Sequence, residues 1–124
     1  MKYTPKQIEK YQRQKYITTL EKITKNLFKI FRDDNSTQKE LIEKFTRLKK
    51  ELDKLEKVLL NGEYHIGMKN YIDKVDSELK SEFIFEEIRQ PNMTQLNRLQ
   101  KLKNQTSYKR DKHKNIENEW RKEF

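Results

Sequence analysis

The stretch LIEKFTRLKKELDKLEKVLL, residues 41–60, contains the most regular apolar pattern of the chain. Its large apolar residues recur at spacings of four, three, four, three and four, which is the heptad register of a coiled-coil-like seam. They are Leu41, Phe45, Leu48, Leu52, Leu55 and Leu59. The pattern predicts a helix over residues 37–61, with a seam that holds together either the fold of one chain or a homodimer.

A turn and a second amphipathic helix precede this seam. Asp33, Asp34, Asn35 and Ser36 all favour turns or caps, and Thr37 with Glu40 matches a capping box. Further back, the cap pattern of Thr4 and Gln7 surrounds Pro5, which suits the first position of a helix. The apolar stripe of that helix is Tyr16, Leu20, Ile23, Leu27 and Ile30, after Ile8 and Tyr11. We therefore expect a helix over residues 5–32.

The stretch LLNGEYHIGMKNY, residues 59–71, holds both glycines of the chain. We expect Gly62 to end the preceding helix in the left-handed conformation, and Gly67 to precede the next one. A phosphate-binding loop would need more glycine and a preceding strand, so we interpret this stretch as a corner between helices. His65 has no cysteine, second histidine or acidic cluster near it in sequence, which favours a loop residue over a site residue.

Two more helices are expected, over residues 68–90 and 93–122. Met68, Ile72, Val75, Leu79 and Phe83 form a helical stripe that stops before Pro91. EFIFEEI, residues 82–88, also fits a broad helical face, although Phe-Ile-Phe favours strands. Met93, Leu96, Leu99 and Leu102 begin the last helix, and its apolar stripe then fades. That helix either projects into solvent or kinks near residues 104–107.

These patterns predict one all-α domain over residues 1–124. The expected fold is an elongated four-helix bundle, or two helical hairpins with coiled-coil-like packing. Charged residues make up 40% of the chain and hydrophobic residues 32%. Leu, Ile, Val and Phe together nevertheless reach about a quarter, above the roughly 20% below which disorder is expected. The chain should fold around a thin core.

Composition argues against several classes of function. The chain has no cysteine, which excludes disulfides, thiolate zinc sites and cysteine nucleophiles. It has no apolar stretch long enough to span a bilayer and no signal-peptide core, so we expect a cytoplasmic protein without a membrane partner. Glu86 with Glu87, Asp33 with Asp34, and His113 with Glu117 are the acid–base candidates, and each is better explained as surface or turn. We expect no catalysis, no cofactor and no metal site.

The net charge of +9 is concentrated in the outer segments. Residues 1–32 carry nine basic side chains against two acidic ones, and residues 91–124 carry nine against four. The middle segment is slightly acidic, with eleven basic side chains against fourteen acidic ones. An asymmetry of this kind points to an anionic partner for the outer helices.

The last helix contains the best candidate site, a basic and polar segment with one tyrosine. Lysine and arginine bind phosphates, and a tyrosine ring can stack on a base. The candidate nucleic-acid-binding residues are Arg98, Lys101, Lys103, Tyr108, Lys109, Arg110, Lys112 and Lys114. A second basic face lies on the first helix, through Lys6, Lys10, Arg13, Lys22, Lys25, Lys29 and Arg32.

The sequence therefore favours a non-catalytic protein that binds DNA or RNA, or a nucleoprotein complex. The alternative is a helical adaptor or inhibitor, of the kind found in phages and mobile elements, that binds a protein partner such as a nucleic-acid enzyme. A third interpretation treats the lysines as a solvated surface, since lysine-rich helix faces usually are. An interfacial membrane helix over residues 17–32 is less economical than a core helix with the same stripe.

Overall fold

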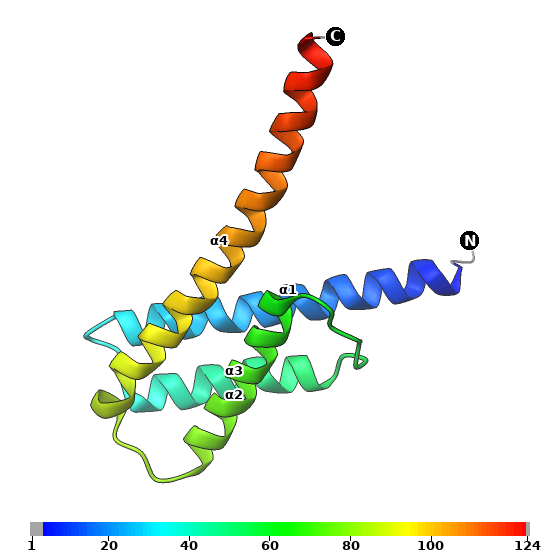
Figure 1. Cartoon of the computed structure of the whole chain (residues 1–124). Coiled ribbons are helices and arrows are strands. Elements are labelled where there is room, and N and C mark those ends of the chain that lie inside the picture. Colours follow the sequence, from blue (N-terminus) through cyan, green and yellow to red (C-terminus); the bar gives the residue numbers. More distant parts are fainter. Residues whose placement is uncertain (1–3, 124) are drawn as a thin grey trace.

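The computed structural model describes the backbone of residues 4–123 and the side chains of residues 4–105. Within that backbone the chain forms four helices and no strand, which confirms the all-α prediction. The helices are α1 (Pro5–Arg32), α2 (Gln38–Asp53), α3 (Glu63–Lys80) and α4 (Phe85–Glu123), shown in Figure 1.

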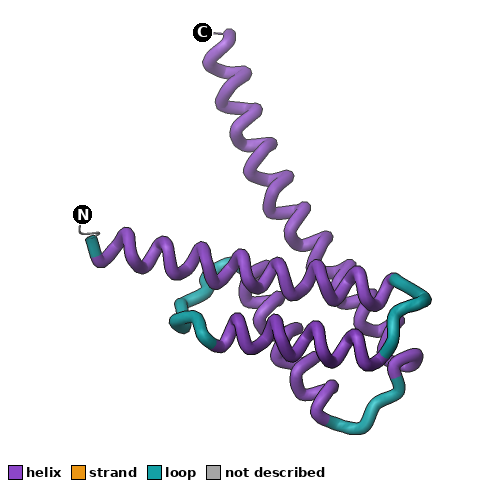
Figure 2. The backbone as a smooth tube through the Cα atoms, turned by 180° about the vertical axis from the view of Figure 1, so that it is seen from behind, coloured by secondary structure: helices purple, strands orange, loops and turns teal. Residues whose placement is uncertain are grey.

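The helices form two hairpins that cross. α1 and α2 lie side by side as one layer, and α3 and α4 pass over that layer in both views (Figures 1 and 2). α1 packs against each of the other three helices. It is therefore the central helix, against which α2 and the second hairpin both pack.

The start of α1 follows the predicted capping box. The backbone N–H of Gln7 donates to the Thr4 hydroxyl at 3.2 Å, and the Thr4 N–H donates to the Gln7 side chain at 3.0 Å. These bonds satisfy two of the N–H groups that the first turn of a helix leaves free. At α2, Thr37 likewise accepts from the Glu40 N–H at 3.2 Å. Both helices therefore begin at the cap that the sequence predicted, and the reciprocal capping box is present at α1.

The core lies where the apolar stripes of the first two helices meet. Leu20, Ile23 and Leu27 of α1 are fully buried together with Leu41 and Leu52 of α2. Met68, Ile72 and Val75 of α3, and Leu96 of α4, close the same cluster from the second layer. The first four positions of the predicted seam are thus core positions of the monomer.

The second helix ends earlier than the heptad pattern predicts. α2 stops at Asp53, not near residue 61, and residues 56–61 form a loop. Leu55, just before this loop, is half-buried and packs against the core, whereas Leu59 within it is 73% exposed. After α2 the chain turns and returns across α1 as α3, so the residues after Asp53 do not continue the helix. The regular spacing of Leu55 and Leu59 did not reveal this.

Both glycines have different roles from those predicted. Gly62 is the N-cap of α3, with φ at −81°, and not a left-handed C-cap. Gly67 lies inside α3 where α4 passes over it, and a Cβ atom there would sit 3.0 Å from Leu99 Cδ2. His65 is a half-buried residue in the first turn of α3, so its assignment to a loop was wrong.

The boundary between the last two helices also differs from the prediction. α3 ends at Lys80, where the Ser81 hydroxyl donates to the Glu78 carbonyl at 2.8 Å, and α4 begins at Phe85. Pro91 lies inside α4 and not between two helices. Proline has no N–H to donate to the carbonyl of Glu87, which is an exposed residue in the first turn of α4. α4 then runs without a break to Glu123 and passes beyond the other helices (Figure 1), as the first of the two alternatives had it.

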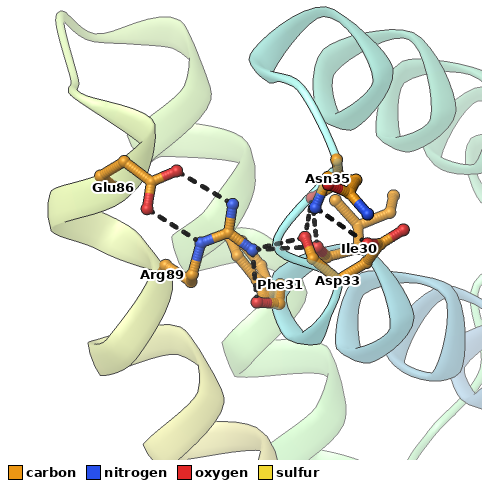
Figure 3. Close-up of polar contacts among 7 residues, drawn as sticks. Ile30, Phe31, Asp33, Asn35, Glu86 and Arg89 are labelled. Atoms are coloured by element: carbon orange, nitrogen blue, oxygen red, sulfur yellow. Dashed lines mark hydrogen bonds and ion pairs between the residues drawn. The ribbon is translucent and has the colours of Figure 1, made fainter.

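Arg89 joins α4 to the corner between α1 and α2. Its Nη1 donates to the carbonyl oxygens of Phe31 at 2.7 Å and Asp33 at 2.8 Å, which are acceptors at the end of α1 (Figure 3). Its Nε and Nη2 donate to the two carboxylate oxygens of Glu86, and its guanidinium lies 4.5 Å from the centroid of the Phe85 ring. A buried cation thereby caps the last turn of another helix.

Tyr71 and Asn92 form a buried polar link between α3 and α4. The Tyr71 hydroxyl donates to Asn92 Oδ1 at 2.8 Å, and Asn92 Nδ2 donates to Glu78 and to the Ile88 carbonyl. Among the described side chains, no buried nitrogen or oxygen lacks a hydrogen-bond partner. Burial raises the pKa of Tyr71 well above its ordinary value, and the negative charge of Glu78 raises it further.

This raised pKa predicts a specific loss of stability in alkali. A phenol in the unfolded chain ionises near pH 10, whereas buried Tyr71 keeps its proton. The contribution of Tyr71 to the free energy of unfolding is complete below pH 10. It falls as the pH rises further, by about 1.4 kcal/mol per pH unit. Urea unfolding between pH 9 and 12 should therefore show a shallower decline for Tyr71→Phe than for the wild type. Lysine titration is common to both proteins, so equal slopes would mean that Tyr71 ionises without unfolding.

Candidate nucleic-acid interface

The structure divides the predicted residues of α4 between different sides of the helix. Lys103 lines a groove between α4 and α1, and Arg98 lines a separate groove against α3 with Lys74. Lys101 is exposed and lines neither groove. Tyr108, Lys109, Arg110, Lys112 and Lys114 lie on the helical backbone of α4, but their side chains are outside the described residues.

The groove between α1 and α4 brings the two predicted basic faces together. We call it the α1–α4 groove, and its volume is about 250 Å³. It is lined by Thr24, Lys25, Phe28, Lys29, Arg32, Tyr64, Leu96, Leu99, Gln100 and Lys103. Lys25, Lys29 and Arg32 lie three or four residues apart on α1, and so they share one face of that helix. Within the side chains described, no acidic residue belongs to this lining.

Two aromatic rings lie among the cations of the groove. The guanidinium carbon of Arg32 is 5.3 Å from the centroid of the Phe28 ring, and Lys103 Nζ is 5.9 Å from that of Tyr64. Both distances are within the range of cation–π attraction. Each ring is therefore paired with a cation at the groove.

One acidic residue, Glu21 of α1, lies next to the groove. Its carboxylate is 3.1 Å from Lys103 Nζ and ties α4 to α1. Burial, followed by the negative charge of Glu21, raises the pKa of Tyr64 to about 12. Tyr64 is therefore a neutral hydrogen-bonding group at neutral pH. Lys103 is shared between the groove and this ion pair, whereas Lys25, Lys29 and Arg32 are exposed.

Two of the acid–base candidates, Glu86 and Asp33, have structural contacts. Glu86 is held by Arg89, and the Asp33 side chain accepts from the Asn35 N–H at 2.9 Å. Among the side chains of residues 4–105, no cluster of three or more His, Asp or Glu could hold a metal ion. None of the helices described is both long enough and apolar enough to cross a membrane. His113 and Glu117 lie outside the described side chains.

The first turns of α1 carry an exposed apolar surface, ahead of the stripe that begins at Tyr16. Ile8 is 44% exposed and Tyr11 67% exposed, because α2 ends before it reaches them. With Leu55 they line a second groove, of about 840 Å³, at the other end of α1 from the corner capped by Arg89.

Sequence reasoning named the basic residues of the α1–α4 groove but not the groove itself. Tyr64 and Gln100 were missed because neither belongs to a basic cluster, and their place depends on how α3 and α4 cross α1. Comparison of the chain with protein-family profiles, with curated protein sequences and with solved structures finds no match.

Proposed function

We propose that the protein binds nucleic acid through its phosphates, with the α1–α4 groove as the centre of the binding surface. The observation that carries this proposal is the meeting of Lys25, Lys29 and Arg32 of α1 with Lys103 of α4. These residues are far apart in the sequence, and the crossing of two helices gathers them around one concave site.

The charges of the groove suit a polyanion. Lysine and arginine neutralise phosphates and release the counterions that surround them, and short polar donors add hydrogen bonds. Gln100 offers such a donor within the groove. The described lining contains no carboxylate that would repel a phosphate. Glu21, next to the groove, offsets the charge of Lys103, so the exposed cations of α1 supply most of the positive potential.

The same helix extends the basic surface beyond the groove. α4 carries Lys103 and then, about two to three turns further along, Lys109, Arg110, Lys112 and Lys114. A nucleic acid that is bound in the groove and follows α4 would run along this basic segment of the sequence. The proposed surface therefore runs from the end of α1 along α4.

Neutralising the groove should weaken binding and flatten its salt dependence. We expect the triple variant Lys25→Gln, Lys29→Gln, Arg32→Gln to bind a labelled oligonucleotide about a hundredfold more weakly near 0.1 M salt. The slope of log affinity against log salt should shrink by about 2 for a single strand, because three phosphate contacts are lost. Fluorescence anisotropy at several salt concentrations measures both quantities.

A variant with the same charge change elsewhere is the control. Lys50, Lys54 and Lys57 are exposed and lie outside the groove, so their replacement by Gln should change the affinity far less. The set Lys109→Gln, Arg110→Gln, Lys112→Gln, Lys114→Gln tests the extension along α4. Equal losses in the groove variant and the control would reject the groove as the centre. No binding at low salt would reject the function and favour the adaptor or inhibitor that binds a protein.

A further inference from the structure

We infer that the nucleic acid bound in the α1–α4 groove is single-stranded and that one of its bases enters the groove. This inference rests on the proposed function and adds the class of strand and the way it is read. The observation behind it is the placement of two aromatic rings, Phe28 and Tyr64, among the cations of one concave site.

The shape of the groove favours a single nucleotide over a duplex. Its volume of about 250 Å³ is below the roughly 300 Å³ at which pockets for drug-sized ligands begin, so one base or nucleotide would fill it. The cations line a recess between two crossing helices and do not stand on a ridge. Proteins that read a duplex usually insert a helix or ribbon into its major groove. A single strand can instead bend into a recess.

The rings and cations provide surfaces on which a base can stack. Arg32 lies over the Phe28 ring, and bases stack on guanidinium planes as well as on aromatic rings. Lys103 lies over the Tyr64 ring at a longer distance, 5.9 Å. Arg32 is exposed at the end of a long side chain, so it can turn to a phosphate and leave its ring to a base, whereas Lys103 is held by Glu21. Lys25 and Lys29 remain for the phosphates on the α1 side.

Charge alone would produce the opposite preference. A duplex has a higher density of phosphates than a single strand, and each phosphate contact releases more counterion from it. Tighter binding of a single strand would therefore measure a contribution from the bases. Removal of those bases should abolish the preference without removing the dependence on salt.

The test compares three ligands that carry the same number of phosphates. They are a labelled single strand of mixed sequence, a duplex hairpin, and an abasic strand. We expect the intact strand to bind about tenfold more tightly than the abasic strand at the same salt concentration, as base stacking requires. We also expect it to bind more tightly than the duplex.

Substitutions in the groove connect this effect to the two rings. Phe28→Leu with Tyr64→Leu should weaken binding of the intact strand about tenfold and leave the abasic strand unchanged. Tyr64→Phe keeps the ring and should bind as the wild type does. Tyr11→Leu is the matched control, since Tyr11 is an exposed aromatic residue of α1 outside this groove.

The outcomes separate this inference from the proposed function. If the intact strand, the abasic strand and the duplex bind alike, and the leucine variants bind like the wild type, the entry of a base is refuted while phosphate binding remains. If no ligand binds at low salt, or binding survives neutralisation of the groove, then the proposed function itself has failed. Thermal melting of each variant confirms that a loss of binding is not a loss of folding.

Discussion

Leu52→Ala is expected to lower the free energy of unfolding by about 3 kcal/mol, within the 2 to 5 kcal/mol typical of buried leucines. Leu52 is 1% exposed and lies between α1 and α2 in the core. The substitution removes buried methyl groups, and the surrounding side chains can only partly close the cavity that remains. Urea unfolding with an unchanged slope would measure the difference.

Leu59→Ala is the matched control, because both leucines belong to the same periodic series in the sequence. Leu59 is 73% exposed in the loop after α2, so its truncation should change stability by no more than about 0.5 kcal/mol. Equal losses for the two variants would contradict the observed end of α2. If the urea midpoint of unfolding instead depended on protein concentration and fell in Leu59→Ala, that result would indicate a dimer held by the loop.

Arg89→Ala should cost about 3 kcal/mol, although arginine is a polar residue. The guanidinium donates to the carbonyl oxygens of Phe31 and Asp33, which truncation would leave without this partner at the end of α1. Hydrogen bonds from charged donors contribute about 1.5 to 3 kcal/mol each, and loss of the contact with the Phe85 ring adds to this. Denaturant unfolding at pH 7 provides the measurement.

Two further variants separate the carbonyl contacts of Arg89 from its ion pair. Glu86 is 74% exposed, so Glu86→Gln should cost less than about 1 kcal/mol, as surface ion pairs do. Arg89→Lys keeps the charge but loses the planar guanidinium, which donates both to Glu86 and to the carbonyls at the end of α1. Its cost should lie between those of Glu86→Gln and Arg89→Ala. If Glu86→Gln proved as harmful as Arg89→Ala, the ion pair would be the source of stability.

The sequence predicted those parts of the fold that depend on local patterns. The capping box at Thr4, the turn after α1 and the buried positions Leu41 to Leu52 all follow from neighbouring residues. The ends of α2 and α3 did not follow, because they are set by where the second hairpin crosses the first. Leu59 has the right spacing for the seam, but no helix faces it.

The candidate site was predictable to a similar extent. Charge counting found Lys25, Lys29, Arg32 and Lys103, whose side chains now line one groove. It could not separate Arg98 and Lys101 from Lys103, because the rotation of α4 against α1 and α3 decides which side each residue faces. Tyr64 carried no signal, since its role depends on a contact between segments far apart in the sequence.

The central position of α1 has a consequence for the way in which the molecule unfolds. α2 and the hairpin of α3 and α4 all pack against this helix, so neither layer can keep its core once α1 separates. If one layer opened alone, the apolar surface of the layer that stayed folded would be exposed to water. The body of the fold should therefore behave as one cooperative, two-state unit despite its two-layer appearance.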